Sequence, residues 1–98
     1  MLNLEWSKDA IEDLEMIWDN IAQDDVDAAD TFVEKLRDEA RNACVVPKAG
    51  YVIPEFENDL YRERYYKGYT IVYEIKDECI LVHEVYNQRR VFIRAYNR

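Results

Sequence analysis

The sequence predicts an α+β fold in the order β-α-α-β-β-β, with a helical hairpin packed on one face of a mostly antiparallel four-stranded sheet. Apolar residues recur at three- and four-residue spacing between residues 8 and 46, as in amphipathic helices. After residue 60 they alternate with polar residues, as in strands. Only 2 glycines and 2 prolines interrupt the 98 residues. We therefore expect a single domain over residues 1–98.

A short strand is expected at the start of the chain, because Leu2, Leu4 and Trp6 alternate with polar residues. Ser7 then offers a helix N-cap, and the apolar stripe that follows predicts an amphipathic helix from about residue 8 to 22. The acidic residues beside this stripe are expected to form a solvated face: Glu12, Asp13, Glu15 and Asp19.

A second amphipathic helix follows a short acidic connection, and Asp25 or Asp27 is expected to cap it. The helix should end near Val46, because Pro47 disfavours helical geometry in the residue before it. Since the connection between the two helices is short, they should form an antiparallel hairpin.

The remaining chain is predicted to be a loop over residues 47–59 and then three strands joined by short turns. The strand patterns span residues 60–66, 69–75 and 79–86. The stretch 91–98 fits either a short strand or a helical turn. The first strand of the chain is expected to join the sheet at an edge.

The charge is divided between the two parts of the chain. Residues 1–59 carry 16 acidic and 5 basic side chains, a net charge of −11, whereas residues 60–98 carry 5 acidic and 8 basic, a net charge of +3. The second part also holds seven of the eight tyrosines. Arginine and tyrosine on strands suit phosphates, bases or an acidic peptide. The total of −8 argues against general nucleic-acid binding, although a local basic face can still bind within the Debye length of about 8 Å.

The cysteines and the chain's hydropathy exclude several classes of protein. Cys44 and Cys79 are isolated, so both are expected to be small core residues, and neither a metal nor a cofactor is predicted. The first residues lack the apolar core of a signal peptide, and no apolar run approaches 18 residues. We therefore expect a cytoplasmic protein without a membrane partner.

Four segments are informative in their order and spacing: WSKDAIEDLEMIWDNI, AADTFVEKLRDEA, PKAGYVIPEF and YRERYYKGYTIVYEIKDECILVHEVYNQRR. Together they resemble the RelE/ParE superfamily of bacterial toxins. The resemblance covers nearly the whole chain. The long helical hairpin and the PEF loop look more like the ParE side of the superfamily than the ribonuclease side.

The resemblance implies the toxin of a type II toxin–antitoxin system, which causes growth inhibition and plasmid stabilization and is neutralised by a cognate antitoxin from a neighbouring gene. Inhibition of DNA gyrase, as by ParE-like members, is the favoured activity. One alternative is a RelE-like endoribonuclease that cleaves mRNA on the ribosome. Another is a degenerate homologue that only binds antitoxin. A homodimer and a toxin–antitoxin heterotetramer are both open.

Two positions depart from the superfamily pattern. Thr70 follows Tyr69 where the superfamily usually has arginine, and Asn87 stands where histidine is frequent. Both differences remove groups that would hold a proton or a phosphate, so they weaken the ribonuclease hypothesis.

The candidate site residues are the arginines and tyrosines of the strands. If the chain cleaves RNA, Arg62 and Arg90 would stabilise the phosphate and Tyr86 would protonate the leaving oxygen. The residues expected to bind antitoxin or nucleic acid are Arg62, Arg64, Arg89, Arg90 and Tyr96. The alternative for these arginines is solvated surface ion pairs.

Alternation along the first of the three later strands places Arg62 and Arg64 on one face and Tyr61 and Tyr65 on the other. Tyrosine rings bury more readily than guanidinium groups. We therefore expect the arginines on the face that the helices leave uncovered. His83, the only histidine, is expected to be a structural, hydrogen-bonded strand residue rather than a general base.

Overall fold

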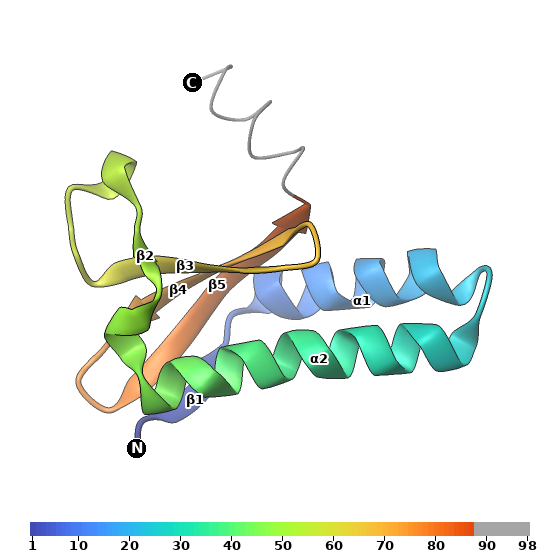
Figure 1. Ribbon diagram of the computed structural model, residues 1–98, viewed down its shortest axis with the longest axis horizontal. Helices are drawn as coiled ribbons and strands as arrows, with labels where there is room; N and C mark the ends of the chain where they lie inside the picture. Colours follow the sequence, from blue (N-terminus) through green and yellow to red (C-terminus); the bar gives the residue numbers. More distant parts are fainter. Residues whose placement is uncertain (88–98) are drawn as a thin grey trace.

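Two helices and a five-stranded sheet form the fold in the computed structural model, which describes residues 1–87 (Figure 1). The elements are β1 (Asn3–Trp6), α1 (Lys8–Ala22), α2 (Val26–Val45), β2 (Tyr51–Val52), β3 (Tyr61–Tyr66), β4 (Tyr69–Ile75) and β5 (Cys79–Asn87). Three predicted site residues lie outside the described residues, as does the stretch 91–98: Arg89, Arg90 and Tyr96. Within the described residues, no helix is long and apolar enough to cross a membrane.

The strand order in the sheet is β1-β5-β4-β3-β2, and the predicted α+β class is confirmed. β1 lies at one edge, as expected, and runs parallel to β5, whereas the other neighbouring strands are antiparallel. The prediction of four strands missed β2, which pairs with β3 inside the segment expected to be a loop. Two residues are too few to give a readable alternation of apolar and polar side chains.

Side-chain caps fix the start of both helices. Ser7 Oγ accepts a hydrogen bond of 3.0 Å from the Ala10 amide, and Asp25 Oδ1 accepts one of 3.1 Å from the Ala28 amide. Ser7 is the predicted cap of α1. Of the two residues predicted as possible caps of α2, Asp25 and Asp27, Asp25 is the cap. Both predicted helix ranges are confirmed, and α2 ends at Val45, before Pro47.

The main core lies between the helical hairpin and one face of the sheet (Figure 1). Its buried members include Leu14, Ile17, Val33, Leu36, Ile71, Tyr73, Ile80, Val82 and Val85. Cys44 and Cys79 are buried and free, as expected of small core residues. A smaller cluster of Ile53, Val72 and Tyr86, with Tyr61 packed against it, forms a second apolar group.

α1 completes the hydrogen bonding of β5 beyond the end of β1. The Ser7 hydroxyl donates to the carbonyl of His83 over 2.8 Å, and the Val85 amide donates to Asp13 Oδ2 over 2.9 Å. Asp13 was expected on a solvated helix face, but it is half-buried and bound to β5. Backbone groups at a strand edge need partners, and this carboxylate supplies one where β1 has already ended.

Candidate functional site

Arg62 is tied to the backbone around β2. Its Nε donates to the Asp59 carbonyl over 2.7 Å, and its Nη1 donates to the carbonyls of Lys48 and Gly50, each over 3.1 Å. These bonds join the segment before β2, at Lys48 and Gly50, to the segment after it, at Asp59. Three of the donors of this guanidinium are thus used to hold the fold together.

Arg64 reaches the second helix. Its Nη2 lies 3.1 Å from Glu39 Oε2 of α2, and its Nε lies 3.3 Å from the same oxygen. The two side chains are 19% and 26% exposed, so the ion pair is largely shielded from water. Their burial makes the pair more than a solvated surface bridge.

The prediction that these two arginines lie on the sheet face that the helices leave uncovered is wrong. In the β3–β4 register, Arg62 lies opposite Tyr73 and Arg64 opposite Ile71, and both partners belong to the core beneath the helices. The arginines therefore lie on the helix-covered side, near the edge of the sheet. There, backbone carbonyls and Glu39 accept hydrogen bonds from the guanidinium groups. The general tendency of arginine to be exposed does not take such partners into account.

The opposite face carries a row of rings, which we call the aromatic face: Tyr51, Phe56, Tyr61, Tyr65 and His83. Tyr61 stacks on His83 with ring centroids 5.7 Å apart and meets Phe56 edge-on at 5.0 Å. Tyr51 and Tyr65 form a separate pair at 5.5 Å.

Carboxylates accompany these rings. His83 Nε2 lies 2.9 Å from Glu74 Oε1, so the prediction that His83 is a hydrogen-bonded strand residue is confirmed, and its structural role stays a prediction. The Tyr65 hydroxyl donates to the Glu63 carboxylate. Partial burial and this hydrogen bond raise the pKa of the Tyr65 hydroxyl above its ordinary value.

The proposed catalytic group is not assembled within residues 1–87. Arg62 lies on the helix-covered side, whereas Tyr86 belongs to the small cluster with Val72 and Tyr61, on the aromatic side. Arg90 lies outside the described residues. In the described part of the chain, no three His, Cys, Asp or Glu side chains gather as metal ligands.

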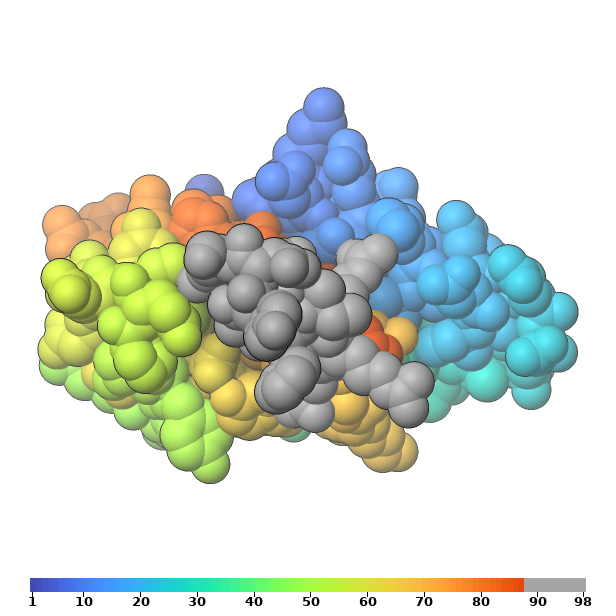
Figure 2. All heavy atoms as spheres, turned by 90° about the horizontal axis from the view of Figure 1, so that it is seen from above, coloured from blue at the N-terminus to red at the C-terminus, as the bar shows by residue number. Residues whose placement is uncertain are grey.

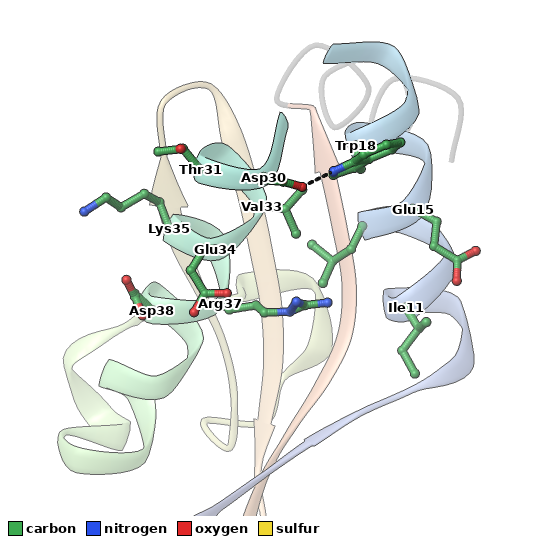
Figure 3. A pocket seen from close by; sticks show the side chains of 11 residues that line it. Ile11, Glu15, Trp18, Asp30, Thr31, Val33, Glu34, Lys35, Arg37 and Asp38 are labelled. Carbon is green, nitrogen blue, oxygen red and sulfur yellow. Dashed lines mark hydrogen bonds between the residues drawn. The ribbon is translucent and has the colours of Figure 1, made fainter. Parts of the chain in front are cut away.

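A groove runs between the two helices and has a volume of about 760 Å³ (Figure 3). Apolar side chains from both helices line it, including Ile11, Leu14 and Val33. Ile11 is 47% exposed although it belongs to the apolar stripe of α1. Trp18 Nε1 donates to Asp30 Oδ1 over 2.8 Å and so links α1 to α2 beside the groove.

Two cations line this groove, Lys35 and Arg37, and neither forms an ion pair with a described residue. Arg37 extends from α2 toward α1 (Figure 3). Arg41, one turn later, is by contrast bound to Glu34 at 2.9 Å and to Asp38 at 2.6 Å. An apolar groove with an available guanidinium suits an amphipathic helix that carries a carboxylate.

This groove was not predicted from the sequence. The apolar stripes of both helices were expected in the core, and the acidic residues beside the α1 stripe in a solvated face. The available signal was the width of the α1 stripe, which continues past the buried Ala10 and Leu14 to Ile11.

The fold is shared with a solved structure. The chain "Chromosomal ParDE TA system from P. aeruginosa" superposes with a TM-score of 0.73 at 19% identity, over 89% of this chain and 96% of that one. At this identity the match establishes the α+β architecture. No curated protein sequence matches the chain.

The family model described as "ParE toxin of type II toxin-antitoxin system, parDE" matches residues 4–92. The match covers most of the sequence, so the chain belongs to the ParE toxin family. The resemblance to the RelE/ParE superfamily, on its ParE side, is confirmed, and the protein is a ParE-type toxin of a type II toxin–antitoxin system.

Proposed function

We propose that a cognate antitoxin, the product of a neighbouring gene, neutralises this toxin by laying an amphipathic helix in the α1–α2 groove, and that the free toxin inhibits DNA gyrase. The observation that carries the first part is the groove itself. Apolar side chains line it, and Arg37 remains without an acidic partner among the described residues.

Each part of the groove has a counterpart on such a helix. Apolar side chains at three- and four-residue spacing would cover Ile11 and Val33 and remove them from water. A carboxylate on the same helix would pair with Arg37. The acidic residues of the rim, Glu15 among them, would select against a helix that is acidic along its whole length.

Inhibition by binding is favoured over RNA cleavage. The donors that Arg62 would need for a phosphate are partly taken by three carbonyls, and Arg64 is paired with Glu39. His83 is held by Glu74 and stacked on Tyr61, which suits a structural role. Thr70 replaces the arginine that superfamily members usually carry.

Expression of the toxin in a bacterium, without and with the neighbouring gene, tests this function. We expect growth arrest with DNA breaks and SOS induction, reversed by co-expression of the antitoxin. Purified toxin should also inhibit supercoiling by gyrase in vitro. Fragmentation of mRNA at codon boundaries without DNA breaks would contradict the gyrase proposal, and growth without any effect would indicate a degenerate homologue.

A further inference from the structure

We propose that the aromatic face of the sheet is a second docking surface, and that it binds an extended polypeptide segment bearing arginine side chains. This inference goes beyond the antitoxin groove and the gyrase target and rests on neither. It is argued from the exposure of the rings, the charge around them and their spacing along β3.

The rings of this face are available to a partner. Tyr51 is 65% exposed, Tyr65 45% and Phe56 42%. Their contacts with one another leave much of this ring surface in water. A guanidinium group stacks on an aromatic face more favourably than an ammonium group, because it is planar and more weakly hydrated.

The charge around the rings selects a cationic partner. Glu63 accepts from Tyr65, Glu74 holds His83, and Glu55 and Glu57 flank Phe56. Among the described residues, β4 and β5 contain neither lysine nor arginine, and both arginines of β3 lie on the helix-covered side. A guanidinium placed on a tyrosine ring would therefore find carboxylates beside it and no competing cation from these strands.

The spacing of the rings fits a peptide segment with two cationic side chains better than a single cation. One group of rings is centred on Tyr61 and the other on Tyr65, four residues along β3. At about 3.3 Å per residue, these centres are roughly 13 Å apart. Two arginines four residues apart on an extended segment would reach both groups together.

This surface is separate from the α1–α2 groove. The rings lie on the sheet face opposite the helices, whereas the groove lies between the helices and is lined by residues 11–18 and 30–38. The segment around residues 50–60 lies at one end of the molecule and the turn between α1 and α2 at the other (Figures 1 and 2). Both surfaces can thus be tested on the same full-length protein, and the loss of one does not bear on the other.

The test is an NMR titration of the isotope-labelled full-length toxin with a nine-residue peptide of serine and threonine that has arginines at positions 3 and 7. We expect the largest shift changes at Glu63, Tyr65 and their ring neighbours, and an affinity about fivefold higher than for the same peptide with lysines. Glu63→Gln and Tyr65→Thr should each weaken binding about tenfold. Glu15→Gln, the same charge change in the helical groove, should weaken it less than about twofold.

Four results would overturn the proposal. If Glu15→Gln and Glu63→Gln lowered the affinity for the arginine peptide equally, the peptide would be attracted by net charge alone. If the lysine peptide bound as tightly as the arginine peptide, guanidinium stacking would be excluded. Nuclear Overhauser contacts between residues 88–98 and the rings of Tyr61 or Tyr65 in the free toxin would show that the chain's own end covers the face. Chemical shifts of the same rings that change with toxin concentration in the absence of peptide would show that a second copy of the toxin occupies the face.

Discussion

Arg62 shows how one residue connects the parts of the β2 region. Its guanidinium binds carbonyls before and after β2, so the side chain fixes the path of the chain into β3. Hydrogen bonds from a charged donor contribute more than neutral ones; the bond to the Gly50 carbonyl is half-buried, and those to Asp59 and Lys48 are exposed.

We expect Arg62→Ala to lower the free energy of unfolding by about 2–3 kcal/mol, because several carbonyls lose a charged donor at once. Urea denaturation measures this change. Arg37→Ala serves as the control, since Arg37 has no ion pair among the described residues and should change stability by less than about 0.5 kcal/mol. Full stability of Arg62→Ala would contradict the structural role.

The Arg64–Glu39 pair is expected to couple β3 to α2. A double-mutant cycle with alanine at both positions should give a coupling energy of about 1 kcal/mol, because the pair is mostly shielded from water. The exposed Arg41–Glu34 pair, at 52% and 56% exposure, should give a clearly smaller value. Equal coupling in the two cycles would mean that burial does not strengthen the first pair.

Gly50 is required by its neighbours rather than by its backbone angles. A Cβ at this position would collide with the Tyr73 hydroxyl, which donates to the Pro47 carbonyl over 2.7 Å, and would lie 3.1 Å from the Glu63 carbonyl oxygen. Gly50→Ala should therefore destabilise the fold by about 1–3 kcal/mol.

Gly68→Ala is the matched control for Gly50→Ala. Gly68 has a φ of +86° with open space around it, so alanine there should cost about 1 kcal/mol from backbone strain alone. Thermal or urea unfolding compares the two variants. A smaller loss at Gly50 than at Gly68 would show that Tyr73 moves aside without penalty.

At the scale of elements, the two helix caps have unequal roles. Ser7 caps α1 and also donates to the His83 carbonyl of β5, whereas Asp25 caps α2 only. We expect Ser7→Ala to cost about 1.5–2 kcal/mol and Asp25→Ala about 1 kcal/mol, measured by urea unfolding. Equal losses would show that the bond between Ser7 and β5 contributes nothing.

The helices and the long strands were predictable because their signals are local. Apolar spacing, the caps Ser7 and Asp25 and the breaker Pro47 set helix limits that the structure confirms. β2 was not predictable, because two residues carry no periodicity. Nor was the bond from the Val85 amide to Asp13, which depends on how α1 lies over β5.

The candidate surfaces were harder to predict because they depend on contacts between distant elements. Alternation correctly separates Arg62 and Arg64 from Tyr61 and Tyr65, but it does not say which face the helices cover. The ranking of residue types by burial then gave the wrong face, since Glu39 and three carbonyls satisfy the arginines. The groove depends on the spacing of two helices, which no single segment encodes.

At the scale of the whole molecule, the helical hairpin and the sheet present different chemistry. The hairpin offers an apolar groove with an arginine that has no ion pair among residues 1–87, and the far face of the sheet offers rings with carboxylates. Under our two proposals, the antitoxin would bind the helices and an arginine-bearing segment would bind the far face of the sheet.

The affinity of the toxin for the product of its neighbouring gene, measured by calorimetry, tests the central proposal most directly. Ile11 and Met16 are both on α1 and are 47% and 50% exposed, but only Ile11 lines the groove. We expect Ile11→Glu to weaken binding at least about a hundredfold, because a charge would be buried against the partner helix, and Met16→Glu to leave it nearly unchanged. Equal affinities of the Ile11→Glu variant and the unaltered toxin would contradict the proposal that the antitoxin occupies the groove.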